Sequence, residues 1–140
     1  MSDEAGVLGA HAEGKVSAAG SLVGGLRLPA DKSVAHRALL FTAMAEGEAE
    51  VTVARPGEDV LSMAHVLQTL GAVESIGEGP VGYTRVRIRG GGTAKAAVLP
   101  GSGGEMLDCG NAGTAMRLLI GALAGRPALA TLSGDSSLSS

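Results

Sequence analysis

The sequence predicts a mixed α/β (α+β) fold, and three observations support this prediction. Segments with the apolar spacing of strands and of helices alternate along the chain. Their order, strand-helix-strand-helix-strand-strand, then begins a second time. Hydrophobic residues make up 45% of the 140 residues and charged residues 18%, which is enough apolar material for a packed core and too much for a disordered chain. Because Phe41 and Tyr83 are the only aromatic residues, this core is expected to consist of aliphatic side chains.

The first predicted elements precede residue 48. Short apolar stretches broken by Gly and Pro predict strands at 16–23 and 25–28. A helix is predicted at 31–45, because apolar residues recur there at helical spacing. The residues of this apolar stripe are Val34, Ala38, Phe41 and Ala45, and it is broadened by Leu39, Leu40, Ala43 and Met44. Asp31 is suited to cap the start of the helix, and Gly47 is expected to end it.

The same two spacings predict the later elements. The predicted strands are 49–55, 73–76, 83–89 and 128–132, and the predicted helices are 58–70 and 111–124. Gly71 is expected to close the first of these two helices. In the strand at 83–89, Arg85, Arg87 and Arg89 alternate with apolar residues, which favours the solvated face of an edge strand.

An internal repeat relates the two parts of this element order. Asp31 aligns with Asn111, and Arg37 then aligns with Arg117, because 80 residues separate both pairs. The expected divisions are a flexible tail at 1–15 and a domain at 16–140, with a first repeat unit at about 16–105 and the start of a second at about 106–140. Since the second unit stops where its next helix should begin, the repeat predicts a truncated chain. The alternative is that the Ser- and Gly-rich end is a natural tail.

Both repeat units bring a hydroxyl group and a guanidinium group to one face at the start of a helix. The residues concerned are Lys32, Ser33 and Arg37 in the first unit and Gly113, Thr114 and Arg117 in the second. A helix start carries unpaired N–H groups and partial positive charge, so cations are disfavoured there by about 0.3–1 kcal/mol each. A bound anion would remove this conflict, and Gly113 would let it approach the backbone. We therefore predict a phosphate or carboxylate site at each helix start; the alternative is that these cations are solvated or paired with carboxylates.

Composition argues against several other classes of function. A net charge of −3 and only two aromatic residues are unlike a nucleic-acid-binding protein. No apolar run approaches the ~18 residues that span a bilayer, and the first 15 residues lack the features of a signal peptide. With Cys109 as the single cysteine and no metal-ligand spacing among the three histidines, we expect no disulfide, no metal site and a reducing, cytoplasmic location.

Structural explanations are favoured for the remaining polar residues of interest. His36 adjoins Arg37 but is expected to be structural. Glu58 and Asp59 compensate the partial charge of a helix start. Cys109 precedes a helix start, where a thiol pKa can fall, but no partner base lies nearby in the sequence, so a catalytic thiol is not expected.

Three motifs resemble the 5-enolpyruvylshikimate-3-phosphate synthase family of enolpyruvyl transferases. They are LPADKSVAHRALL at 28–40, GEDV at 57–60 and CGNAGTAMRLL at 109–119. The resemblance implies two domains, each made of three βαβαββ units that form an inside-out α/β barrel with helices packed inside. About one and a half of these units would be present here.

The resemblance also implies an activity. The family transfers the enolpyruvyl group of phosphoenolpyruvate to the 5-hydroxyl of shikimate 3-phosphate and releases phosphate, without a metal or an organic cofactor. A monomeric, cytoplasmic enzyme of aromatic amino acid biosynthesis is therefore expected, with these two small molecules as its partners and with neither nucleic acid nor membrane.

Site residues follow from the motifs of the resemblance. Residues that would bind shikimate 3-phosphate are Lys32, Ser33 and Arg37, and Lys32 would also contact phosphoenolpyruvate as the catalytic residue. Residues that would line the phosphoenolpyruvate site, where glyphosate also binds, are Asn111 and Gly113, with Thr114 and Arg117 in support.

This chain departs from the family pattern in two respects. Leu118 stands where many relatives have proline, which would affect the helix that shapes the inhibitor site. The family's catalytic carboxylate and lysine, and an arginine that binds phosphoenolpyruvate, belong to later segments, so we expect the 140-residue chain to be inactive alone. The alternatives are a relative of the enzyme that acts on UDP-N-acetylglucosamine and a non-catalytic module that binds phosphorylated metabolites.

Overall fold

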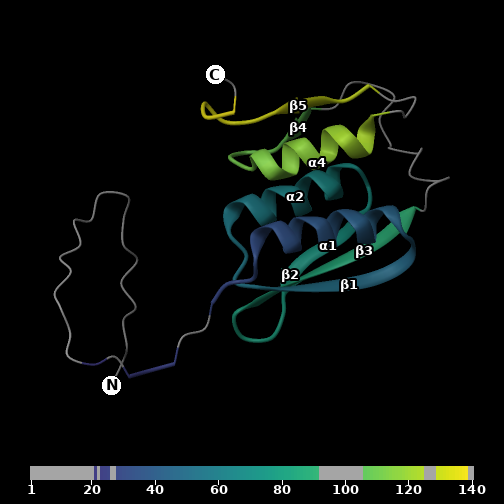
Figure 1. Cartoon of the computed structure of the whole chain (residues 1–140). Coiled ribbons are helices and arrows are strands. Elements are labelled where there is room, and N and C mark those ends of the chain that lie inside the picture. Colours follow the sequence, from purple (N-terminus) through teal and green to yellow (C-terminus); the bar gives the residue numbers. More distant parts are fainter. Residues whose placement is uncertain (1–20, 22, 26–27, 92–105, 125–128, 139–140) are drawn as a thin grey trace.

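The computed structural model describes residues 21, 23–25, 28–91, 106–124 and 129–138. Its elements, in chain order, are α1 (Lys32–Met44), β1 (Glu46–Ala54), α2 (Glu58–Thr69), β2 (Val73–Glu78), β3 (Tyr83–Gly91), β4 (Met106–Asp108), α4 (Gly113–Leu123) and β5 (Thr131–Ser133). Helices α1 and α2 cover one face of the β1-β3-β2 sheet, α4 packs on these two helices, and the β4-β5 pair lies beyond them (Figure 1). The predicted mixed α/β class is confirmed.

The larger sheet is antiparallel and has β3 in its centre. Val86 of β3 pairs with Val51 of β1 on one side and with Ile76 of β2 on the other. The prediction that the arginine-rich strand is an edge strand is therefore wrong. Its alternation predicted a half-solvated strand correctly, but alternation alone does not distinguish central from edge positions in an antiparallel sheet.

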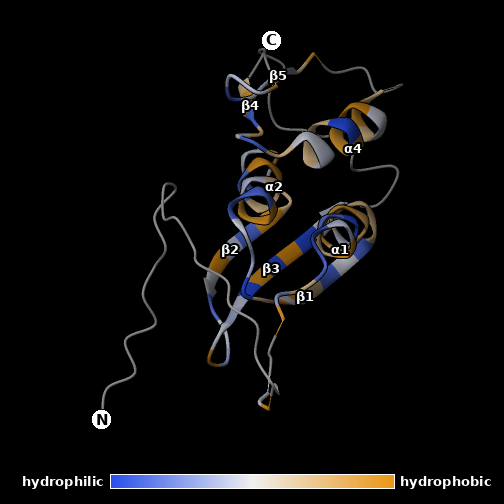
Figure 2. Cartoon of the chain, turned by 60° about the vertical axis from the view of Figure 1, so that its left-hand side comes forward, coloured by the Kyte–Doolittle hydropathy of each residue, from blue (hydrophilic) through white to orange (hydrophobic). Residues whose placement is uncertain are grey.

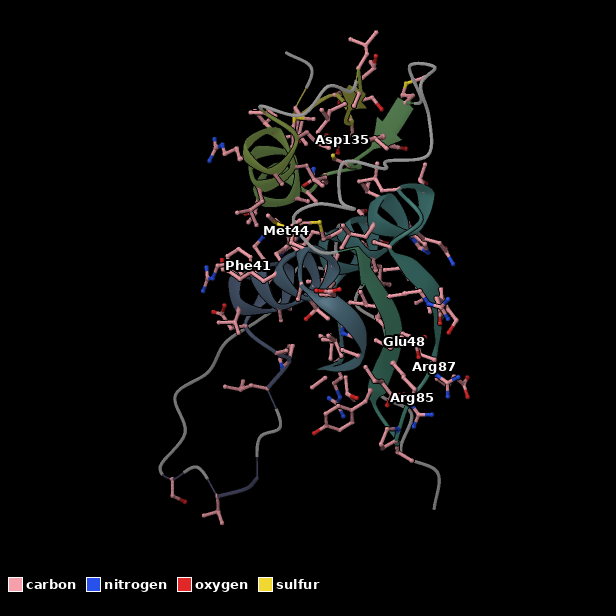
Figure 3. The ribbon with its side chains drawn as sticks, turned by 90° about the vertical axis from the view of Figure 1, so that its right-hand side faces the viewer. Phe41, Met44, Glu48, Arg85, Arg87 and Asp135 are labelled. Carbon is pink, nitrogen blue, oxygen red and sulfur yellow. The ribbon has the colours of Figure 1, made fainter. Side chains whose placement is uncertain are left out.

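The arginines of β3 lie on the solvated face of this sheet and pair with glutamates of both neighbouring strands. Arg89 contacts Glu48 at 2.9 Å and Glu74 at 2.8 Å, and Arg85 contacts Glu50 at 3.0 Å. Figure 3 shows such charged side chains on the side of the sheet away from the helices. Cross-strand ion pairs of this kind explain how a central strand carries three cations.

The core extends from the larger sheet through α1 and α2 to α4 and β4. Its fully buried side chains include Leu39, Met63, Ile88, Leu107 and Leu119. Bands of hydrophobic residues on β3 lie under α1 and α2 in Figure 2. As expected, this core contains neither of the two aromatic side chains, which are both exposed.

Helix α1 buries one side of the predicted stripe, including Leu39, Leu40 and Ala43, and leaves the other side exposed. Its buried residues are Ala35, His36, Leu39, Leu40 and Ala43, whereas Val34 is 56% and Phe41 59% exposed. Apolar residues surround most of this helix, so periodicity alone did not select the face that packs on the sheet. The predicted cap is confirmed, because Asp31 Oδ1 accepts a hydrogen bond of 2.8 Å from the Val34 N–H.

Several predicted boundaries need correction. Helix α1 ends at Met44, and Gly47, expected to end it, lies inside β1 with a φ of 105°. Gly71 does close α2, with a φ of 74°. The described residues of the strands predicted at 16–23 and 25–28 are not in strands, and the other residues of those segments lie outside the described part. The tail at 1–15 and the first residue of the strand predicted at 128–132 lie outside it as well.

Two similar backbone hydrogen bonds precede α1 and α4. The Ala30 N–H donates to the Ala54 carbonyl at 3.0 Å, and the Cys109 N–H donates to the Ser133 carbonyl at 2.8 Å, with 79 residues between equivalent partners. In both cases a residue just before a helix, α1 or α4, donates to the last residue of the strand that follows that helix, β1 or β5. The short strand β4, which the sequence analysis missed, belongs to this second pairing.

Candidate functional site at the helix starts

The start of α1 presents the first group of predicted site residues. Lys32 and Arg37 are exposed and Ser33 is half-buried. Lys32 Nζ lies 2.9 Å from Asp59 Oδ2, with 64% of the Lys32 side chain and 19% of the Asp59 side chain exposed. Lys32 is therefore paired with a carboxylate of the protein itself. This pairing was the alternative to a bound anion at the start of α1.

Asp59 comes from the first turn of α2 and is held there by its own helix. Its Oδ1 accepts a hydrogen bond of 2.9 Å from the Val60 N–H, while Oδ2 contacts Lys32. Partial burial raises the pKa of Asp59, but the hydrogen bond and the charge of Lys32, together with the Val60 N–H, lower it by more, so that the pKa lies below its ordinary value. Asp59 is therefore an ionised partner that orients Lys32 across the two helix starts.

His36 joins the same two helices from inside the core. Its side chain is fully buried, and its two ring nitrogens contact the backbone carbonyl of Lys32 and, at 3.1 Å, that of Asp59. The expectation that His36 is structural is confirmed. By holding the backbone of both members of the ion pair, it keeps the starts of α1 and α2 together.

The start of α4 has a different arrangement. Asn111 Nδ2 donates hydrogen bonds to Asp135 Oδ2 at 2.7 Å and to Ser137 Oγ at 2.9 Å. Thr114 is half-buried and Arg117 is exposed on the helix that follows. A Cβ atom on Gly113 would lie 3.3 Å from Leu138 Cδ2, so the space that the sequence analysis reserved for a ligand adjoins this leucine.

The two groups lie along one edge of the molecule. Lys32 contacts the first turn of α2 through Asp59, and a Cβ atom on Gly110, just before α4, would lie 3.0 Å from Ser62 Oγ in the next turn of α2. Figure 1 shows α1, α2 and α4 side by side, with their first turns on the same side. Three helix starts, each with unpaired N–H groups and partial positive charge, thus share an edge with Lys32 and Asn111.

Cys109 is set back from this edge and buried. Burial raises the pKa of its thiol, and the neighbouring carboxylate of Asp108 raises it further. A nearby helix start can lower a thiol pKa, but the pKa of Cys109 is raised. The thiol is thus mostly protonated at neutral pH, which agrees with the expectation that it is not a nucleophile.

Asp135 and Ser137 are site residues that the sequence analysis did not single out, and Asp59 was explained only as charge compensation. One signal could have found the two aspartates. The repeat aligns Gly57-Glu58-Asp59 with Ser133-Gly134-Asp135, and in the structure each aspartate holds a polar residue at the preceding helix start.

Among the described residues, no group of three or more His, Cys, Asp or Glu side chains could hold a metal ion. None of the helices described is long and apolar enough to cross a membrane.

Comparison with known proteins identifies the class to which this fold and site belong. The sequence family described as EPSP synthase (3-phosphoshikimate 1-carboxyvinyltransferase) matches residues 16–140. The chain belongs to this family of enolpyruvyl transferases, as its motifs predicted.

Individual relatives carry the same name. The 3-phosphoshikimate 1-carboxyvinyltransferase of Cereibacter sphaeroides is 43% identical over 119 residues, which are 85% of this chain and 25% of the relative. That of Afipia carboxidovorans is 47% identical over 120 residues, with 85% and 25% covered. That of Thermus thermophilus is 47% identical over 125 residues, with 89% and 27% covered. The chain thus spans about a quarter of the length of these relatives.

Proposed function

We propose that this chain forms part of the substrate site of a 3-phosphoshikimate 1-carboxyvinyltransferase. The whole enzyme would transfer the enolpyruvyl group of phosphoenolpyruvate to the 5-hydroxyl of shikimate 3-phosphate and release phosphate. Family membership over residues 16–140 supports the activity. We further propose a cytoplasmic, monomeric enzyme that uses these two substrates without a metal or an organic cofactor.

The observation that carries the proposal is the shared edge of three helix starts. Both substrates are anions, and backbone N–H groups at a helix start bind phosphate and carboxylate groups well. Lys32, Ser33 and Arg37 would bind shikimate 3-phosphate, and Lys32 would also stabilise negative charge during enolpyruvyl transfer. The start of α4 would contribute Asn111 and Gly113 to the phosphoenolpyruvate site, with Thr114 and Arg117 as supporting residues.

Lys32 would exchange part of its ion pair for the substrate phosphate. A contact of 2.9 Å with a partly exposed carboxylate contributes about 0.2–1 kcal/mol. A phosphate group held by several charge-assisted hydrogen bonds interacts more strongly than this single pair. Asp59 would therefore keep the lysine oriented without preventing substrate binding.

The proposal includes the larger architecture. The similar backbone hydrogen bonds of Ala30 and Cys109 support a chain of βαβαββ units. Residues 16–105 and 106–140 would be the first unit and the start of the second in an inside-out barrel, preceded by a tail at 1–15.

Titration with shikimate 3-phosphate tests the function. Binding to the 140-residue chain is measured by calorimetry for the wild type and for Lys32→Ala and Arg37→Ala. We expect each substitution to weaken binding about tenfold, because each removes a charge-assisted contact. Arg87→Ala is the matched control, since Arg87 lies on the far face of the sheet beside Glu50. Equal affinity in all four proteins would contradict the proposed site.

A further inference from the structure

A cavity of about 470 Å³ is lined by the residues just after β1 and by the loop that joins β2 to β3. Arg55 and Glu78 contribute charged groups to its lining, and Pro80 and Tyr83 contribute apolar surface. Its volume lies within the range of about 300–1,000 Å³ that is typical of small-molecule sites. Figure 1 shows the β2-β3 loop on the side of the molecule where α1 and α2 begin, but none of the residues assigned above to the two substrates lines this cavity.

Arg55 has an unusual backbone conformation beside the cavity. Its φ is 41°, and in the described part of the chain every other residue with a positive φ is a glycine. This left-handed region is sterically costly for a residue that has a Cβ atom. The Arg55 N–H donates to the Gly82 carbonyl at 2.9 Å, but a glycine could form the same backbone hydrogen bond without the steric cost. The turn therefore does not explain an arginine at this position, and strained residues of this kind cluster at binding sites.

The Arg55 side chain lies against the β2-β3 loop. A Cβ atom on Gly82 would be 3.6 Å from Arg55 Nε and 3.9 Å from Arg55 Cγ. Among the described residues, neither Arg55 nor Glu78 takes part in an ion pair. The cavity thus offers one cation and one carboxylate that the described protein leaves without partners of opposite charge.

These two charges together restrict the class of ligand. A simple anion would be attracted by Arg55 but repelled by Glu78, and a simple cation would meet the reverse. A zwitterion would satisfy both groups, because its carboxylate would accept charge-assisted hydrogen bonds from the guanidinium while its ammonium donates to Glu78. Pro80 and Tyr83 would then cover an apolar part of the same molecule.

We propose that this cavity binds an α-amino acid in its zwitterionic form, with an apolar side chain. The carboxylate of the ligand contacts Arg55, its ammonium contacts Glu78, and its side chain lies against Pro80 and Tyr83. This site is separate from the one proposed at the helix starts and does not depend on it. Its test therefore stands whether or not the chain binds shikimate 3-phosphate.

Titration of the full ¹⁵N-labelled chain with L-leucine provides the first test. We expect saturable shifts of the Gly82 and Tyr83 amide signals at about 1–10 mM leucine. N-acetyl-L-leucine, which has no ammonium, and L-leucinamide, which has no carboxylate, should each bind at least tenfold more weakly. The proposal is overturned if leucine causes no saturable shift, or if either derivative binds as tightly as leucine, because the site would then not recognise a zwitterion.

Variants of the two charged residues provide the second test. Arg55→Gly removes the guanidinium and also relieves the strained backbone, so we expect leucine binding at least tenfold weaker at an unchanged or higher Tm. Glu78→Gln should also bind leucine at least tenfold more weakly. Glu74→Gln is the matched control, because Glu74 lies in the same strand but pairs with Arg89, and it should bind leucine like the wild type. Undiminished binding in Arg55→Gly, or a Tm well below that of the wild type, would show that the arginine does not serve a ligand and would overturn the proposal.

Discussion

Asp59 combines roles that are usually assigned to different residues. It compensates the partial charge at the start of α2, accepts a hydrogen bond from the Val60 N–H and forms the ion pair with Lys32. Its backbone carbonyl also contacts the buried ring of His36. Asp59 thus stabilises the start of α2, contacts α1 and orients Lys32, the proposed catalytic lysine.

The lowered pKa of Asp59 predicts a specific acid sensitivity. A carboxyl group whose pKa is lower in the folded than in the unfolded state stabilises the fold above its unfolded pKa, and this stabilisation is lost as pH falls through the folded pKa. For Asp59 the loss therefore occurs below about pH 4, near and below its ordinary value of 3.8. Asp59→Asn should lower the free energy of unfolding by about 1 kcal/mol or less at pH 7, because the pair is partly exposed.

Urea unfolding between pH 7 and pH 3 measures this effect. The difference in unfolding free energy between wild type and Asp59→Asn should shrink toward zero as the pH reaches 3. Lys32→Met, which removes the charge partner, should show the same trend, whereas Glu78→Gln should behave like the wild type. A difference that stays constant over this range would contradict the assignment.

At the scale of elements, Gly90 explains how closely α1 lies on the sheet. A Cβ atom at Gly90 of β3 would lie 2.1 Å from the Ala45 carbonyl oxygen and 2.6 Å from that of Thr42. These oxygens belong to the backbone at the end of α1 and have little freedom to move. The helix end and the central strand therefore touch directly, which only a residue without a side chain allows.

Gly90→Ala should accordingly destabilise the chain. Overpacking typically costs about 1–3 kcal/mol, and backbone contacts leave little room for relaxation. Gly77→Ala is a matched control in the neighbouring strand β2, because nothing lies within 4 Å of its added Cβ atom. That variant should remain within about 1 kcal/mol of the wild type, with a small gain from the restricted unfolded chain. Urea unfolding would contradict the argument if the two substitutions had equal effects.

The helices and strands also show what the sequence could and could not predict. Periodicity predicted α1, α2 and α4 and the strands of the larger sheet, because these elements bury a face against one another. It did not predict β4, since three residues are too few for a pattern. On α1 it placed Val34 and Phe41 in the same stripe as the buried Leu39, although both are exposed. Which side of a broad stripe is buried depends on neighbours that lie far away in the sequence.

Site prediction had a corresponding limit. Motifs identified Lys32 and Asn111 from their local sequence. Their partners Asp59 and Asp135 follow 27 and 24 residues later in the chain, and only the strand crossing back beside each helix brings them near. How Lys32 and Asn111 are held depends on these distant partners and could not be read from the motifs alone.

At the scale of the molecule, we expect two units, the described residues of 28–91 and of 106–138, to differ in stability. In the first, three antiparallel strands support α1 and α2. In the second, β4 and β5 form a parallel pair of three residues each, and α4 buries only Ala115 and Leu119. Two short strands are marginally stable on their own, so the second unit is expected to open before the first.

Amide hydrogen exchange tests this order of opening. Amides of Val86 and Ile88 in the centre of β3 should exchange only through global unfolding, whereas those of Leu119 in α4 and Leu132 in β5 should exchange at least tenfold faster through local opening. Leu119→Ala removes the main buried contact of α4 and should cost about 2–5 kcal/mol. Because α4 packs chiefly on α1 and α2, this cost should appear as faster exchange in α4, β4 and β5 with little change in β3. Exchange that accelerates equally in β3 would instead mean that the chain unfolds as one cooperative body, with the second unit as firmly bound as the first.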